Sequence, residues 1–141
     1  MILKKRPALI IILLVAAAVG LYPWQSMVVP EWKVRIVDQK GVPLANTGVR
    51  EVWQDYSSET RSHQQDLVTD NDGYVSFPKR TIRSPFVLRI IKSAINSLNP
   101  HHSSGPDAFV IVLTSEYDTW SNNSAVPGQP LPKEVVVKKN R

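Results

Sequence analysis

Two short turn phrases constrain the fold of this 141-residue chain more than any other feature. One covers residues 40–44 (KGVPL), and the other covers residues 69–78 (TDNDGYVSFP). Glycine and asparagine adopt positive φ at low cost, and aspartate can bond to its own backbone two residues further on. Strand-like residues flank both phrases. The second phrase predicts a β-hairpin, and the pair favours a fold built from short strands.

The alternation of apolar and polar residues supports the same interpretation. Trp32, Val34 and Ile36 alternate with polar neighbours, which is the period-2 pattern of a half-buried strand. The expected strands are residues 32–37, 48–56, 64–69, 74–77, 86–92, 108–114 and 135–137, the last as an edge strand. No amphipathic helix pattern is expected after Trp24. The predicted fold class is therefore all-β: an antiparallel β-sandwich of about seven strands, preceded by one N-terminal hydrophobic helix.

The N-terminal segment places basic residues before a hydrophobic run. Lys4, Lys5 and Arg6 precede residues 8–22, which carry no charge. This pattern is typical of either a signal peptide or a membrane anchor, and both alternatives stay open. The basic residues are expected to hold the N-terminus in the cytoplasm, so the chain from Gln25 onward should lie on the other side of the membrane.

Features at the end of this run support each alternative. Small residues at positions 16–18 and 18–20 have the spacing that signal peptidase requires. Tyr22 and Trp24 instead suit an aromatic belt at the edge of a bilayer. The expected organisation has four parts. These are residues 1–24 as a signal-anchor or signal peptide, 25–31 as a spacer, 32–114 as the sandwich domain, and 115–141 as a loop and edge strand with a basic tail.

Composition limits the partners and the compartment. The chain has no cysteine, which excludes disulfides, thiolate metal sites, a cysteine nucleophile and a lipidated cysteine. Exported domains without disulfides are ordinary in bacteria, so a bacterial cell membrane with a periplasmic domain, or secretion after cleavage, is expected. The net charge is +5, and residues 4–6 supply three of those charges, so +2 remains. Nucleic acid is not an expected partner.

The turn phrases also carry a family resemblance. The matching residues are Gly41, Pro43, Leu44, Val49, Thr69, Asp70, Asp72, Gly73, Phe77 and Pro78. In this arrangement the segment from Trp32 to Lys92 resembles the carboxypeptidase regulatory-like domain, a transthyretin-like (prealbumin-like) β-sandwich. The resemblance implies a non-catalytic module, found beside peptidases, transporters and surface proteins, and it implies no active site.

Two groups of residues invite a metal. Residues 70–73 (DNDG) resemble the start of a calcium loop, but its twelfth position falls on Thr81, which has no carboxylate. His101 and His102, with His63 and Asp107, could ligate zinc or copper. The first group is interpreted as a turn and the histidines as exposed loop residues. No nucleophile elbow is present. The sequence therefore predicts no catalytic, cofactor-binding or metal-binding residue and no enzyme activity.

Aromatic residues offer another kind of site. A platform for a sugar or a partner protein could be formed by Trp32, Trp53, Trp120, Tyr56, Tyr74 and Tyr117. Core packing explains Trp32, whereas Trp120 is harder to bury. Two functions are therefore expected. The first is a non-enzymatic, membrane-tethered interaction or structural module whose partners are the membrane and another envelope protein. The alternative is a carbohydrate or small-ligand binding module that uses exposed aromatics.

Overall fold

The computed structural model describes residues 6–98, 105–118 and 130–140. These residues form a mostly β structure with two helices, one of them N-terminal as expected. The elements are α1 (Arg6–Leu21), β1 (Pro23–Val29), β2 (Trp32–Asp38), β3 (Gly48–Asp55), β4 (His63–Val68), β5 (Tyr74–Phe77), β6 (Arg80–Pro85), α2 (Phe86–Ser97), β7 (Pro106–Leu113), β8 (Tyr117–Asp118) and β9 (Glu134–Lys139). His101, His102 and Trp120 lie outside the described residues.

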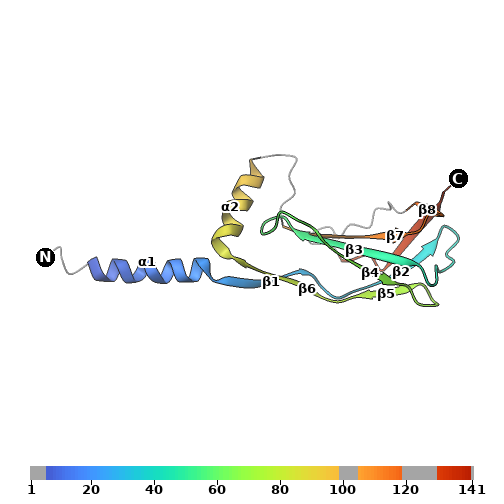
Figure 1. The fold of residues 1–141 in the computed structure, drawn as a ribbon, viewed down its shortest axis with the longest axis horizontal. Coiled ribbons are helices and arrows are strands. Elements are labelled where there is room, and N and C mark those ends of the chain that lie inside the picture. The colour runs from blue at the N-terminus through green and yellow to red at the C-terminus, as the bar shows by residue number, and fades with distance from the viewer. Residues whose placement is uncertain (1–5, 99–104, 119–129, 141) are drawn as a thin grey trace.

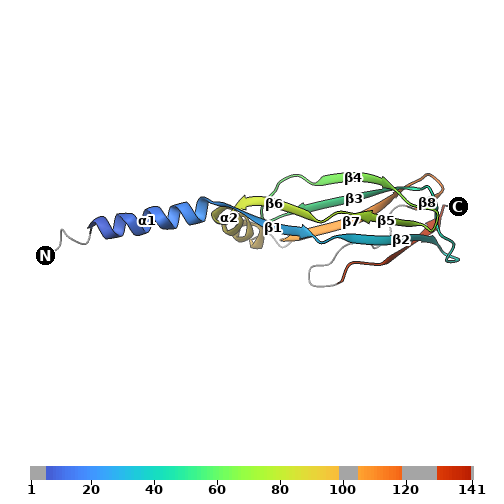
Figure 2. The same cartoon turned by 90° about the horizontal axis from the view of Figure 1, so that it is seen from below.

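The strands of the described residues form three sheets. Their orders are β5-β2-β9-β8, β4-β3-β7 and β1-β6. We call this assembly of strands the β body. Helix α1 projects from one end of the β body, α2 stands at that same end, and the C-terminus lies at the opposite end (Figures 1 and 2). The strand-rich part of the prediction and its N-terminal helix are thus confirmed.

One hydrophobic core lies between the two larger sheets. Buried side chains alternate along the strands, as the period-2 pattern predicts. Trp32, Ile36 and Phe77 come from one sheet, and Val49 and Val110 come from the other. Trp32 is 2% exposed, and its indole Nε1 donates to the carbonyl of Pro132 at 2.7 Å. The core therefore joins the beginning of the β body to the last part of the chain.

The pairing of strand β9 differs from the prediction of an antiparallel fold, and its place bears on the prediction of an edge strand. Strand β9 pairs with β2 in parallel, with Ile36 opposite Val135, so the fold is not wholly antiparallel. In the order of the sheet it lies between β2 and the two-residue β8, but β8 pairs only with Lys138 and Lys139. Val135 and Val137 are buried in the core. Burial of these two side chains favours the pairing of β9 with β2 over the core.

The two turn phrases fold into turns with the same hydrogen bonds. In the first, Asp38 Oδ1 accepts from the backbone N–H of Lys40 and Val42, at 2.8 and 2.9 Å. In the second, Asp70 Oδ1 accepts from the residues at the same two offsets, at 3.0 and 2.8 Å. A glycine with φ near +80° follows each aspartate by three residues. Aspartate and glycine therefore supply the side-chain acceptor and the positive φ that each turn needs.

The second turn is not a hairpin, contrary to the prediction. It connects β4 to β5, but β4 pairs with β3 and β5 pairs with β2. The turn thus carries the chain from one sheet to the other. Its carbonyl at Gly73 accepts from Ile36 N at 2.8 Å, which docks the turn against β2 and the first turn phrase.

Residues 86–92 form part of helix α2 rather than the predicted strand. Over seven residues, apolar positions at period 2 and at period 3.6 are difficult to distinguish. The pattern becomes helical when the window is extended to residue 98, because polar side chains then recur at positions 89, 92, 93, 96 and 97. The expectation that no amphipathic helix follows Trp24 is therefore wrong, and residues 93–97 are not loop.

The expected spacer, residues 25–31, lies largely within a strand. Strand β1 pairs with β6, with Gln25 opposite Arg83 and Met27 opposite Thr81. Strand β1 is mostly exposed up to Met27 and β6 is mostly half-buried or exposed, so neither shows an alternation of fully buried and exposed residues. Helix α1 is apolar and its side chains from residue 7 to residue 19 are exposed. Neither described helix combines the length and hydrophobicity required to cross a membrane.

Candidate functional site

Helix α2 is held on the β body by its polar side. Arg89 donates to the carbonyl of Trp24 at 3.3 Å and to the hydroxyl of Ser26. Lys92 Nζ donates to the carbonyl of Ser58 at 2.9 Å, and Asn96 Nδ2 donates to the carbonyl of Tyr56 at 3.2 Å. The three donors follow one stripe of the helix at spacings of three and four residues. Polar contacts therefore fix α2 to β1 on one side and to the β3–β4 connection on the other.

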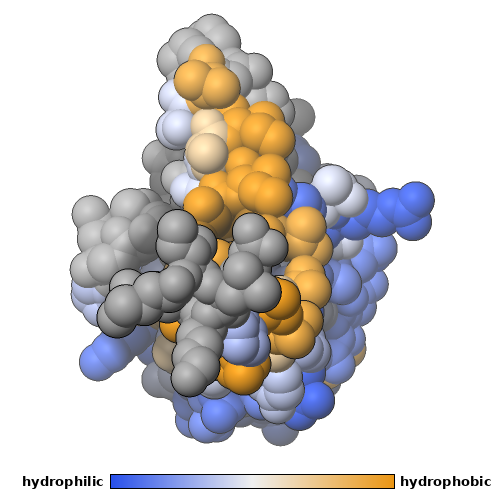
Figure 3. All heavy atoms as spheres, turned by 90° about the vertical axis from the view of Figure 1, so that its left-hand side faces the viewer, coloured by the Kyte–Doolittle hydropathy of each residue, from blue (hydrophilic) through white to orange (hydrophobic). Residues whose placement is uncertain are grey.

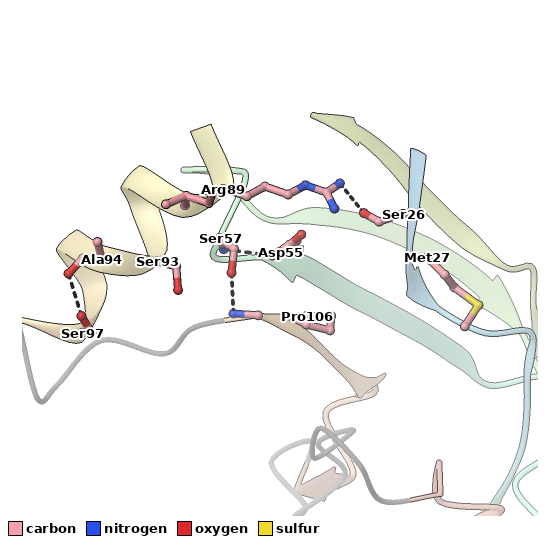
Figure 4. Close-up of a pocket in the computed structure, with 11 residues that line it drawn as sticks. Ser26, Met27, Asp55, Ser57, Arg89, Ser93, Ala94, Ser97 and Pro106 are labelled. Carbon is pink, nitrogen blue, oxygen red and sulfur yellow. Dashed lines mark hydrogen bonds between the residues drawn. The ribbon is translucent and has the colours of Figure 1, made fainter. Parts of the chain in front are cut away.

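A pocket of about 610 Å³ lies between α2 and the adjoining ends of β1, β3 and β7. Figure 4 shows Arg89 extending from α2 toward Ser26, with Asp55 and Ser57 beneath the helix. The polar residues that line the pocket are Ser26, Asp55, Ser57, Arg89, Ser93 and Ser97. Three of these residues lie on α2 and one on β1, so the pocket exists only because α2 is seated there.

Most polar atoms of this pocket already have partners. Asp55 is buried, and its two carboxylate oxygens accept from Ser57 N and Ser58 Oγ, both at 2.9 Å. Ser57 Oγ accepts from Gly105 N at 3.0 Å. Among the described residues, the buried Nε of Arg89 has no hydrogen-bond partner. The pocket is thus lined by serine hydroxyls, by the Asp55 carboxylate and by the Arg89 guanidinium, whose Nε is buried without a partner.

A buried ion pair connects β3 to β6. Glu51 is 0% exposed, and its Oε2 accepts from Arg80 Nε at 2.8 Å and from Arg80 Nη2 at 2.6 Å. Arg80 also donates to the side-chain oxygen of Gln65. Burial raises the pKa of Glu51 above its ordinary value, and the Arg80 guanidinium lowers it by less. The effect of burial on the pKa of Glu51 is therefore larger than the effect of the ion pair with Arg80.

Trp53 is part of the same cluster. Its ring stacks on His63 at 5.5 Å between centroids, and the Arg80 guanidinium lies 4.1 Å from the ring centroid. His63 Nε2 is 2.8 Å from Glu59 Oε1. The ring of Trp53 is thus occupied by neighbouring side chains of the β body, and these contacts position Arg80 against Glu51.

The raised pKa of Glu51 predicts a pH-dependent stability. The folded chain holds this proton more tightly than the unfolded chain, so the contribution is complete below the unfolded pKa of about 4 and is lost as pH rises through the folded pKa. Glu51→Gln mimics the protonated group at every pH. In urea denaturation between acidic and neutral pH, the wild type is expected to lose stability relative to Glu51→Gln as pH rises.

Asp66 provides the control with the opposite sign. The Arg50 guanidinium, 2.6 Å away, lowers the pKa of the exposed Asp66. Its contribution is present above the unfolded pKa and is lost as pH falls through the folded value. The wild type should therefore gain stability relative to Asp66→Asn as pH rises. A difference between wild type and Glu51→Gln that does not change with pH would contradict the assignment for Glu51.

The residues of the calcium-like phrase serve the turn. Asp70 uses one carboxylate oxygen for two backbone N–H groups, as described above. The backbone carbonyl of Asp72 accepts from Arg35 Nε at 3.1 Å. Each contact holds the turn closed and ties it to β2. The structure thus assigns Asp70 a local hydrogen-bonding role that is common for aspartate in turns.

The remaining metal candidates do not come together where the structure describes them. His63 lies on β4 and Asp107 lies on β7, and β3 runs between these strands. Two strand spacings separate their backbones by about 10 Å. Across residues 6–98, 105–118 and 130–140, no cluster of three or more histidine, aspartate or glutamate side chains is suited to hold a metal ion.

The aromatic residues do not form one platform among the described residues. Trp32 is in the core and Trp53 contacts Arg80 and His63. Tyr74 lies beneath Lys33 and Arg35, at 4.7 and 5.5 Å from its ring centroid. Tyr56 and Tyr117 are half-buried on different parts of the β body. The described aromatics thus contribute mainly to packing.

Sequence reasoning missed Glu51, Arg80 and Arg89. A signal for Glu51 was present, since Val49 and Trp53 lie two residues to either side and therefore share its face of β3. Arg80 and Arg89 belong to β6 and α2, the elements that the sequence did not predict.

Comparison with protein-family models, curated proteins and solved structures finds no match for this chain.

Proposed function

We propose that this chain is a membrane-tethered, non-enzymatic β-sandwich module of the bacterial cell envelope, with an interaction or structural role outside the cytoplasm. The observation that carries the proposal is helix α1. Its apolar side chains are exposed on every side, and the helix projects from the β body rather than packing on it (Figure 1). A helix that is apolar all round needs an apolar environment, and lipid supplies one.

The sequence at the two ends of α1 supports the orientation. Lys4, Lys5 and Arg6 precede the apolar residues, which favours a cytoplasmic N-terminus. Tyr22 and Trp24 follow, as an edge-to-face pair with centroids 5.0 Å apart. Trp24 Nε1 donates to the carbonyl of Val19 at 3.1 Å. An amphipathic aromatic pair at this position is typical of the membrane–water interface.

The finer fold assignment is also part of the proposal. The resemblance of the turn phrases to the carboxypeptidase regulatory-like domain supports a transthyretin-like sandwich, and that resemblance implies a non-catalytic module. Binding of carbohydrate through aromatics has less support, because Trp32 is buried and Trp53 is occupied by Arg80 and His63. The partner proposed for the β body is therefore another envelope protein.

The tether is tested by a charge in the middle of α1. Leu14 is 65% exposed, and Leu14→Arg places a charge that costs about 3 kcal/mol in lipid. The wild-type chain is expected to stay with bacterial membranes through an alkaline carbonate wash, and Leu14→Arg is expected to move largely to the soluble fraction. Val68→Arg is the matched control, since Val68 is 63% exposed on β4, and it should behave as wild type.

The mass of the wild-type protein completes this experiment. An intact chain in the membrane pellet supports the uncleaved anchor. A shorter chain in the soluble fraction, beginning near residue 20, indicates a cleaved signal peptide and contradicts the tether.

A further inference from the structure

Helix α2 presents its apolar face away from the protein. Its polar stripe contacts the β body, as described above, and none of its residues is buried. The exposed apolar residues are Phe86, Val87, Leu88, Ile90, Ile91, Ile95 and Leu98. An amphipathic helix on the surface of a soluble domain has the opposite arrangement, with its apolar stripe on the core. The inverted arrangement requires an apolar surface outside the β body.

The apolar face of α2 looks toward the side from which α1 projects. Helix α2 rises across the direction of α1 at the end of the β body (Figure 1). Viewed from the α1 side, a column of hydrophobic side chains covers α2 (Figure 3). Phe86, Val87 and Ile90 also line an apolar groove of about 680 Å³ against Val19 and Gly20 of α1. The apolar surfaces of the two helices are therefore continuous.

The charged residues of the segment that carries α2 are all basic, and the acidic residues Asp55 and Glu59 lie on the opposite, β-body side of the helix. Residues 79–98 contain five basic residues and no acidic residue. Lys79 and Arg83 are exposed, whereas Arg80 pairs with Glu51, and Arg89 and Lys92 donate to the β body. An apolar helix face with exposed basic residues beside it is typical of segments that lie in the interface of a membrane, where basic residues are attracted to an anionic surface.

We propose that α2 lies flat in the headgroup layer of an anionic bilayer, with its apolar face in the lipid and its polar stripe on the β body. This inference rests on the proposed function, because α1 brings α2 to the membrane. Two helices at different angles then contact the bilayer, and the β body is held in one orientation above it. The lipid surface is the occupant that accounts for the apolar face, its direction and the exposed basic residues together.

The absence of cysteine makes the test direct, because each introduced cysteine is the only one in the full chain. Leu14→Cys, Ile91→Cys and Ser76→Cys are labelled with an environment-sensitive fluorophore and reconstituted into vesicles of phosphatidylcholine and phosphatidylglycerol. Lipids with a spin label near the headgroup serve as quenchers for the label at Ile91, and lipids with a spin label deep in the acyl chain serve as quenchers for the label at Leu14. Labels at Leu14 and Ile91 should shift to the blue and lose emission, whereas the label at Ser76, exposed on β5, should do neither.

A label at Ser93 tests the face of α2. Ser93 lies on the same helix but lines the pocket beneath it, so its label should resist the lipid quencher. Circular dichroism checks that each labelled chain keeps the wild-type spectrum. Vesicles of phosphatidylcholine alone should reduce quenching at Ile91 and leave quenching at Leu14 unchanged. Equal quenching at Ile91 in both vesicles would overturn the preference for anionic lipid.

The outcomes separate this inference from the tether. Quenching at Leu14 without quenching at Ile91 would overturn the placement of α2 and leave the tether standing. Oxidative cross-linking between Ile91→Cys chains would overturn it in favour of a second copy of the protein on this face. Absence of quenching at both positions would contradict the tether as well.

Discussion

Arg80→Met is expected to lower the free energy of unfolding by about 3–5 kcal/mol at neutral pH, because it leaves Glu51 buried without its counter-charge. The cost combines the uncompensated carboxylate with the loss of the two Arg80–Glu51 hydrogen bonds. Urea denaturation followed by circular dichroism measures it. The cost should shrink at acidic pH, where the raised pKa of Glu51 lets the carboxyl become neutral.

Two further variants isolate the cause. Arg50→Met removes the partner of Asp66 in an exposed pair between β3 and its neighbour β4, and should leave the urea midpoint nearly unchanged. Arg80→Met combined with Glu51→Leu replaces the buried pair by apolar side chains and should recover most of the lost stability. A double variant no more stable than Arg80→Met would contradict the role given to the unpaired Glu51.

Gly73→Ala is expected to cost about 2–5 kcal/mol of unfolding free energy, because a positive φ costs about 1–2 kcal/mol and overpacking adds about 1–3 kcal/mol. Gly73 has φ +78°, and a Cβ there would lie 2.7 Å from the carbonyl oxygen of Ile36 and 2.9 Å from Pro43 Cβ. The nearest obstacle is backbone, so it cannot move aside as a flexible side chain would. Urea denaturation of the variant gives the value.

Gly41→Ala provides the matched control. Gly41 has φ +80° in a turn with the same aspartate hydrogen bonds, but a Cβ at Gly41 would meet nothing within 4 Å. Its cost should be about 1–2 kcal/mol, from the conformation alone. If both variants lose the same stability, the close packing of the second turn against Ile36 and Pro43 does not contribute.

Local sequence patterns predicted much of the β body. The alternation from Trp32 to Ile36 and the turn residues from Asp70 to Gly73 act over a few neighbours, and the structure forms β2 and β5 where they predict strands. Pairing depends on distant residues. The parallel alignment of β2 with β9, and the assignment of β4 and β5 to different sheets, follow from which apolar faces meet in the core. The spacing of residues within a strand does not specify which other strand it pairs with.

The candidate site was less predictable for a different reason. Helix α2 carries strand-like residues such as Phe86, Val87 and Ile90, and its helical period emerges only when the polar residues through Ser97 are included. The pocket beneath α2 and the pairing of β6 with β1 both depend on that helix or the strand before it. Because residues 86–92 were predicted as a strand and form a helix, most of the residues of the site could not be predicted.

The place of β9 in the sheet also determines when the protein can finish folding. Arg35 pairs with Glu134, and Trp32 donates to Pro132, so β2 can complete its contacts only when residues about 100 positions later have been made. Until then β2 has a free edge beside Val34 and Ile36, which is a hazard for aggregation. A chain that ends before Glu134 lacks Val135 and Val137, which are buried in the core. The complete β body can therefore form only after β9 has been synthesised.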